Sequence, residues 1–149
     1  MPVPRLNLIY VKHCRSRSAV MLRLDLGARI PIATTAMGRA LLAASPDNER
    51  DWLLHHIARR EGKQWPKIRA GIERAIKDLA TRGFTLSVGD WQPDVSAVGV
   101  LLVPADGSGV FAFNCGAPAF QIPRERLETD IGPRLVNLVP NVEAALNRR

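Results

Sequence analysis

The side chains of this sequence that could act as nucleophiles, metal ligands or proton carriers are few and scattered. Cys14 and Cys115 lie far apart, and a reactive thiolate needs a nearby base or cation that neither local sequence supplies. His55 and His56 are adjacent, so on a helix they point about 100° apart and cannot bind one metal ion from one face. The motifs GxSxG, GxGxxG, GxxxxGK[ST] and HExxH are absent. We therefore expect no catalysis, no metal, no cofactor and reduced thiols.

The more informative chemistry lies on one side of three predicted strands, at residues 84–88, 96–103 and 110–115. Side chains alternate between the two faces of a strand, and here large residues alternate with small ones. If the strands pair with their small sides aligned, one face carries Thr85, Ser87, Ala97, Gly99, Ala112, Asn114 and Gly116. Such a face either forms a pocket with a few polar groups or receives a closely packed helix. The pattern leaves both interpretations open.

The run IATTAMGRALLA predicts a second feature, a helix N-terminus after the apolar residues 30–32. Thr34 or Thr35 can cap a helix over residues 36–44. The free amides and partial positive charge of such a terminus can hold a carboxylate or phosphate, although an ordinary capped helix fits equally well. Gly38 lies inside this helix, where glycine costs about 1 kcal/mol relative to alanine. It therefore predicts the close approach of a backbone segment or a ligand.

The predicted elements that position these features include both strands and helices. Strands are expected at residues 6–11 and 20–26, with a polar turn between them and Gly27 at the end of the second. Ser45 as the N-cap and Pro46 in the first turn predict the start of a second helix through residue 57. The order of two strands, three helices, three strands and a final helix predicts an α+β domain with a mainly antiparallel sheet.

Two helices are predicted in the second half of the chain. Residues 65–82 carry an apolar stripe at helical spacing, and Gly83 follows as a stop signal. An amphipathic helix follows Pro123, and Pro133 and Pro140 are expected to bend or break it.

The composition of the 149 residues is that of one globular domain, with 46% hydrophobic and 23% charged residues. No apolar run is long enough to span a membrane and no signal peptide is visible, so we expect a cytoplasmic protein without a membrane partner. The net charge of +7 is concentrated in the first thirty residues, at Arg5, Lys12, Arg15, Arg17, Arg23 and Arg29. These cations could meet nucleic-acid phosphates. Aromatic content of 5% and the absence of a basic helix favour a solvated or subunit-facing strand surface instead.

Two long runs, LRLDLGARIPIATTAMGRALLAA and RGFTLSVGDWQPDVSAVGVLLVPADGSGVFAFNCGAP, together with the final helical segment, resemble the effector-binding domain of IclR-type bacterial transcriptional regulators. The resemblance covers about residues 6–147. It implies a GAF-like fold, a curved antiparallel sheet with helices on both faces and a ligand cavity beside the helix at 36–44. Members of the family bind a small metabolite there, often an organic or aromatic acid, and assemble into dimers and tetramers. Carried over by position, the ligand-binding residues are Ala36, Met37, Gly38, Ser87, Ala97, Asn114 and Gly116.

The sequence also departs from the family pattern. Family regulators carry an N-terminal winged helix-turn-helix, which residues 1–149 lack, so we expect an effector-binding domain that is N-terminally truncated relative to the family and does not bind DNA directly. It is either part of a longer regulator or a stand-alone sensing and oligomerisation domain. Asp94, Leu101, Asn114 and Gly116 replace residues common in the family, so the identity of the effector cannot be transferred. The hypothesis is a non-catalytic, homo-oligomeric sensor of a small carboxylate.

Three rival interpretations remain. One is a purely structural oligomerisation domain with a vestigial pocket. The second is a nucleic-acid-binding accessory domain that uses Arg5, Lys12, Arg15 and Arg17, and the third is a small hydrolase or transferase that uses Cys115.

Overall fold

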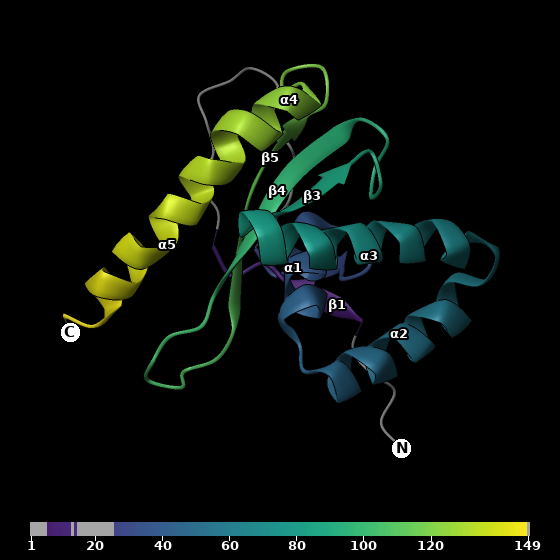
Figure 1. Cartoon of the computed structure of the whole chain (residues 1–149), viewed down its shortest axis with the longest axis horizontal. Coiled ribbons are helices and arrows are strands. Elements are labelled where there is room, and N and C mark those ends of the chain that lie inside the picture. Colours follow the sequence, from purple (N-terminus) through teal and green to yellow (C-terminus); the bar gives the residue numbers. More distant parts are fainter. Residues whose placement is uncertain (1–5, 13, 15–25, 149) are drawn as a thin grey trace.

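The computed structural model describes residues 6–12, 14 and 26–148, and these form the α+β domain expected from the sequence (Figure 1). In chain order the elements are β1 (Asn7–Ile9), β2 (Arg29–Pro31), α1 (Ala36–Ala44), α2 (Asp47–Glu61), the 3₁₀ turn η1 (Gly62–Gln64), α3 (Trp65–Arg82), β3 (Thr85–Val88), β4 (Val95–Leu102), β5 (Phe111–Pro118), α4 (Arg124–Arg126), the π-helical turn η2 (Leu127–Ile131) and α5 (Gly132–Leu146). No helix in this described part of the chain is long and apolar enough to cross a membrane.

The main sheet has the strand order β3-β4-β5, with both pairs antiparallel. Its register aligns two rows of small residues across the strands, first Thr85, Gly99 and Asn114, then Ser87, Ala97 and Gly116. The rows are two residues apart along each strand, so they share one face. The predicted alignment of the small sides is therefore confirmed.

Helices cover both faces of this sheet. On the face with large side chains, Phe84, Leu86 and Val98 form a buried core with residues of η2 and α5. Gly132 at the start of α5 packs against the ring of Phe84, where a Cβ would lie 2.7 Å from the ring. The opposite face carries the two rows of small residues and is called the small face below. There, Gly99 allows the backbone of α1 to approach the sheet directly.

A second core joins α1, α2 and α3. Leu42, Ile57 and Ile72 are almost completely buried there, and Ile68 and Trp65 pack beside them. The apolar stripe predicted for α3 is thus its buried face. Gly83 ends α3 in the left-handed conformation, with φ +80°, as expected for a C-terminal glycine.

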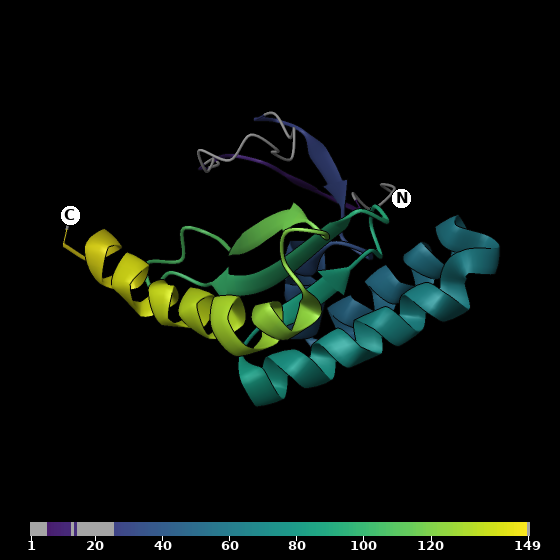
Figure 2. The same cartoon turned by 90° about the horizontal axis from the view of Figure 1, so that it is seen from above.

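The N-terminal strands differ from the prediction. Residues 20–25 of the strand expected at 20–26 lie outside the described residues, and Leu26 and Gly27 form a turn. The strand that pairs with β1 is β2, within the segment we expected only to lead into the first helix. Backbone bonds from Gly27 N to Tyr10 O and from Tyr10 N to Ala28 O extend this pairing, which explains why Arg29–Pro31 is extended. Figure 2 shows the β1–β2 pair apart from the main sheet, on the side opposite α3 and α5.

Two predictions at helix ends also need correction. Ser45 does not cap α2, because both its backbone N–H and its hydroxyl donate to the carbonyl of Leu41, at 3.0 and 2.8 Å. It therefore closes α1, and α2 begins after Pro46 without a side-chain cap. At the C-terminus, α5 continues through Pro140 without a break. The irregular turn lies earlier, in η2, immediately before Gly132 and Pro133.

Candidate functional site

The first turn of α1 is held in place by its own cap. Thr35 is the N-cap residue, and its hydroxyl accepts a bond from the Gly38 amide at 3.2 Å and donates to the Pro31 carbonyl at 2.6 Å. A Cβ on Gly38 would lie 2.2 Å from the Cα of Ile32. Of the two explanations for this glycine, the structure shows the close approach of a backbone segment.

The small face of the sheet binds this helix start through polar groups. The Thr85 hydroxyl donates to the Ala36 carbonyl at 2.6 Å, and the Ser87 hydroxyl donates to the Thr34 carbonyl at 2.6 Å. A Cβ on Gly99 would lie 2.5 Å from the Ala36 carbonyl group. The helix α1 therefore packs closely on the small face around Gly99. This is one of the two interpretations that the sequence left open.

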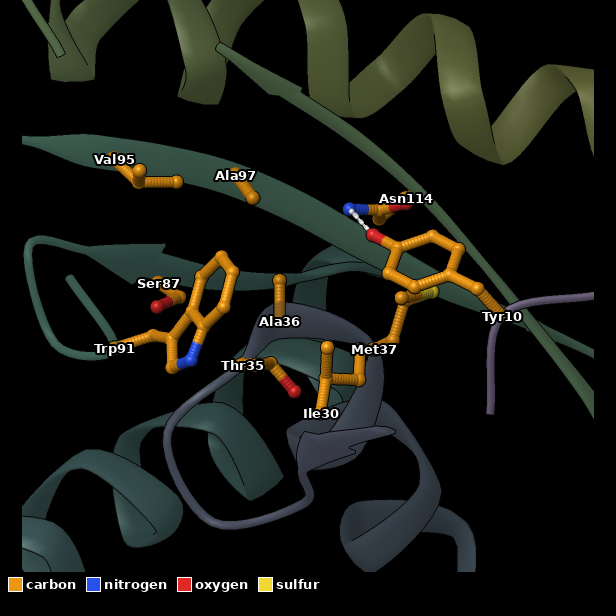
Figure 3. A pocket seen from close by; sticks show the side chains of 10 residues that line it. All are labelled: Tyr10, Ile30, Thr35, Ala36, Met37, Ser87, Trp91, Val95, Ala97 and Asn114. Carbon is orange, nitrogen blue, oxygen red and sulfur yellow. Dashed lines mark hydrogen bonds between the residues drawn. The ribbon is translucent and has the colours of Figure 1, made fainter. Parts of the chain in front are cut away.

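A small cavity lies beside this contact (Figure 3). Its lining residues come from both sheets and the residue after β1, from the start of α1 and from the loop after β3. They are Tyr10, Ile30, Thr35, Ala36, Met37, Ser87, Trp91, Val95, Ala97 and Asn114. The volume is about 20 Å³, far below the roughly 150 Å³ of a cavity that binds benzene. None of the lining side chains is charged at neutral pH, so the cavity offers hydrogen-bonding groups and apolar surface.

Tyr10 and Asn114 form a polar pair at one end of the cavity. The Asn114 side-chain amide donates to the Tyr10 hydroxyl at 3.3 Å, as Figure 3 shows. Burial raises the pKa of the Tyr10 hydroxyl above its ordinary value of 10.0, and the bond from Asn114 works in the opposite direction. The phenol is therefore neutral at physiological pH and can act as a hydrogen-bond donor or acceptor.

The structure brings together five of the seven residues predicted to bind a ligand, since Ala36, Met37, Ser87, Ala97 and Asn114 all line the cavity. Gly38 instead packs against Ile32, and its amide is used by the cap. Gly116 pairs with Ala97 in the sheet but is not among the lining residues. Contact between any of the seven and a ligand stays a prediction.

Half of the lining residues are not predicted from the sequence, namely Tyr10, Ile30, Thr35, Trp91 and Val95. Thr35 was seen only as a helix cap. Trp91 carried one usable signal, because it is a large aromatic residue in a short loop between two strands of the small face. Nothing in the local sequence marks Tyr10 as a pocket residue, because its partner Asn114 lies 104 residues away.

Arg39 is a further residue whose role the sequence did not reveal. It is a cation only 3% exposed, and its side chain donates to the carbonyls of Ala33 and Leu86 at 3.2 and 3.0 Å. It also forms an ion pair with Asp90, with 2.7 Å between Nη1 and Oδ2. Gly71 on α3 leaves the space for its guanidinium, because a Cβ there would lie 2.3 Å from Nη2. Arg39 thus connects α1, α3, β3 and the loop that carries Trp91.

The other chemically capable residues lie elsewhere. Cys115 neighbours Asn114 on β5 and so lies on the opposite face of the sheet. Burial raises the pKa of its thiol, and the charge of Arg126 works in the opposite direction, so thiolate formation at neutral pH is disfavoured. Among the residues that the structure describes, no group of three His, Cys, Asp or Glu side chains could hold a metal ion. Of the four cations in the nucleic-acid interpretation, only Lys12 lies within the described residues.

The fold and the cavity define a class of protein, a GAF-like α+β domain with a small pocket between a helix start and an antiparallel sheet. The family described as bacterial transcriptional regulator IclR C-terminal matches residues 5–139. The chain belongs to this family.

Relatives of known name or structure agree with this assignment. The chain is 30% identical over 144 residues to the HTH-type transcriptional regulator TsaQ1/TsaQ2 of Comamonas testosteroni, covering 95% of this chain and 52% of that protein. The crystal structure of an IclR family transcriptional regulator from Brucella abortus is 44% identical, with a TM-score of 0.89 over 95% of this chain and 53% of that one. The chain therefore spans about half the length of these regulators.

A more distant structure is that of an inducer-binding domain. The double mutant of the PobR inducer-binding domain from Acinetobacter, solved as a complex with 3-hydroxybenzoic acid, is 18% identical with a TM-score of 0.61. The match covers 80% of this chain and 69% of that one. At this identity the likeness shows the shared fold alone.

Proposed function

We propose that residues 1–149 form the effector-binding domain of an IclR-type regulator, which senses a small organic or aromatic acid and contributes to homo-oligomer formation without catalysis. The observation that carries the proposal is the cavity where the first turn of α1 meets the small face of the sheet. Ser87 and Asn114 lie in its wall, and Ile30, Met37 and Val95 supply apolar surface.

The charge of the site favours a ligand with at most one negative charge. Among the described residues no lysine or arginine lines the cavity, and Arg39, a cation of α1, is committed to Asp90. The first turn of α1 contains no acidic residue, so the partial positive charge of the helix end is not cancelled there. The Thr35 hydroxyl occupies the Gly38 amide. We therefore assign the carboxylate to the amides of Ala36 and Met37 and the remaining polar groups of the ligand to Ser87 and Asn114.

Regulation follows if the ligand prefers one arrangement of the subunits. A ligand shifts an equilibrium only through unequal affinity for the two states, and that coupling acts in both directions. In a regulator with a DNA-binding module, this bias would alter the affinity for the operator. The complex of the PobR domain with 3-hydroxybenzoic acid supports the choice of a hydroxybenzoate as a probe.

The test is thermal unfolding in the presence of keto acids, benzoate and hydroxybenzoates at millimolar concentration. A ligand at a hundred times its Kd adds about 2.7 kcal/mol, which raises the Tm of a domain this size by about 5 to 10 °C. A panel without any such shift, on folded protein, would contradict acid sensing and support a structural oligomerisation domain.

The Asn114→Leu variant tests the assignment of the site. We expect it to lose at least most of the ligand-induced shift, because leucine cannot donate or accept a hydrogen bond. Cys115→Ser is the matched control, since it changes the next residue of β5 on the other face of the sheet and should keep the shift. Unchanged affinity in Asn114→Leu would remove Asn114 from the site.

A further inference from the structure

The cavity is too small for the ligands proposed above, so some part of its wall must move. A cavity that binds benzene measures roughly 150 Å³, so a cavity of about 20 Å³ leaves no room for a benzoate. At least one lining side chain must therefore move for such a ligand to bind.

Most of the wall is fixed by backbone pairing. Ser87, Ala97 and Asn114 lie in paired strands of the main sheet, and the start of α1 is bonded to Thr85 and Ser87. At the other end, the backbone of Tyr10 pairs with Gly27 and Ala28, and its hydroxyl accepts from Asn114. The backbones of these residues cannot move apart without breaking the sheet or the contact with α1.

Trp91 differs because it belongs to the loop 89–94 between β3 and β4. Gly89 N donates to Val95 O at the base of the loop, and Val95 N donates to Gln92 O. Gly89 has φ +66°, a conformation that suits glycine in a tight turn. Figure 3 shows the Trp91 indole between Ser87 and Val95 on one side and Thr35 and Ala36 on the other, at the end of the cavity opposite Tyr10. Trp91 is also partly exposed, so its side chain contacts both the cavity and solvent.

The residue beside Trp91 is attached to the helix. Asp90 pairs with Arg39, whose side chain is 4% exposed while that of Asp90 is 23% exposed. The remaining bonds of Arg39, to Ala33 and Leu86, hold the guanidinium on elements that do not belong to the loop. The pair therefore joins a fixed cation to a carboxylate on the loop.

We propose that the loop 89–94 is a lid, that the Trp91 indole occupies the space a ligand takes, and that the Arg39–Asp90 pair is the latch that positions Trp91 in the closed state. The identity of the ligand as an acid rests on the proposed function, whereas the lid and the latch do not. Because the ligand replaces the indole, the site accepts a flat molecule no bulkier than that ring, with polar groups directed to Asn114 and the start of α1.

The latch can be tested without any ligand. The sequence contains three tryptophans, so Trp52→Phe with Trp65→Phe leaves Trp91 as the single fluorescent indole. In this background we expect Asp90→Asn to raise the acrylamide quenching constant at least twofold. Asp94→Asn removes an equal charge from an exposed position of the same loop and should leave quenching unchanged. Equal quenching in the parent and in Asp90→Asn would overturn the latch.

The space-filling role of Trp91 needs a second variant, which also covers the case that Asp90→Asn does not fold. Trp91→Ala removes a partly exposed loop side chain and should open a cavity that indole enters, so that millimolar indole raises its Tm but not that of the wild type. Trp52→Ala is the control, because Trp52 is an exposed tryptophan of α2 outside the cavity. If indole stabilises Trp91→Ala no more than Trp52→Ala, Trp91 does not fill the ligand space.

These outcomes separate the lid from the proposed function. A silent acid panel, together with positive quenching and indole results, would refute acid sensing and support the lid. A clear acid response with unchanged quenching in Asp90→Asn would support the sensor and refute the latch.

Discussion

Replacing Gly99 by alanine would place a methyl group against the first turn of α1. The new Cβ would lie 2.5 Å from the carbon and oxygen of the Ala36 carbonyl and 2.8 Å from the Met37 nitrogen. All three are backbone atoms, so no side-chain rotation relieves the clash. Ordinary van der Waals contact begins at 3.4 Å, and α1 must therefore move away from the sheet by about 0.9 Å.

The cost of this movement follows from what it disturbs. Overpacking of this kind costs about 1 to 3 kcal/mol. The shift also stretches the bonds from Thr85 to Ala36 and from Ser87 to Thr34, both 2.6 Å long, each worth about 1 kcal/mol. We expect a loss of about 2 to 4 kcal/mol in the free energy of unfolding, equivalent to a fall in Tm of about 5 to 15 °C.

Urea unfolding followed by far-UV circular dichroism measures this loss. Gly83→Ala is the control, because its Cβ would make only an ordinary 3.4 Å contact with Val136, so the variant loses only the left-handed preference at φ +80°. That control should cost about 1 kcal/mol. A substitution at an uninvolved surface position changes the free energy of unfolding by no more than about 0.5 kcal/mol. If Gly99→Ala has so small an effect, the direct packing of α1 on the small face of the sheet is wrong.

Two further predictions follow from the same site. Thr35→Ala should lower stability by about 1 to 2 kcal/mol in urea unfolding because it removes the cap of α1, whereas Thr34→Ala, which keeps the carbonyl that accepts from Ser87, should cost clearly less; equal losses would contradict the capping role of Thr35. Tyr10 is the only tyrosine, so ultraviolet titration should give a pKa above 10.0 in the folded protein, and the stability linked to its burial should be fully present below pH 10.0 and be lost as the pH rises through the folded-state pKa. Tyr10→Phe should remove this loss, and an unshifted titration would show that the hydroxyl is not buried.

The sequence predicted the parts of the structure that depend on local periodicity. The spacing of Ile68 and Ile72 marked the buried face of α3, and Gly83 marked its end. The alternation of large and small residues in β4 and β5 identified the face on which the cavity lies. These signals are readable because a helix repeats every 3.6 residues and a strand every two, whatever the rest of the chain does.

At the start of α1, local sequence patterns no longer determine the structure. Both Thr34 and Thr35 fit the capping pattern, and only the positions of Pro31 and Gly38 select Thr35. Ser45 also fits a cap, but a serine can bond to the preceding helix as well as to the following one. Local sequence does not decide between two partners that are equally near along the chain.

The sequence therefore identifies the family and the face of the sheet beside which the cavity lies, whereas the tertiary structure decides whether and where that face is hollow. Tyr10 reaches Asn114 only because β1 is brought beside the main sheet. Trp91 lines the cavity, and Arg39 becomes a buried cation, only because the loop after β3 lies beside α1 and Asp90 supplies the compensating charge. Each of these contacts joins residues that share no repeat and no motif, and its existence depends on where the whole chain places them.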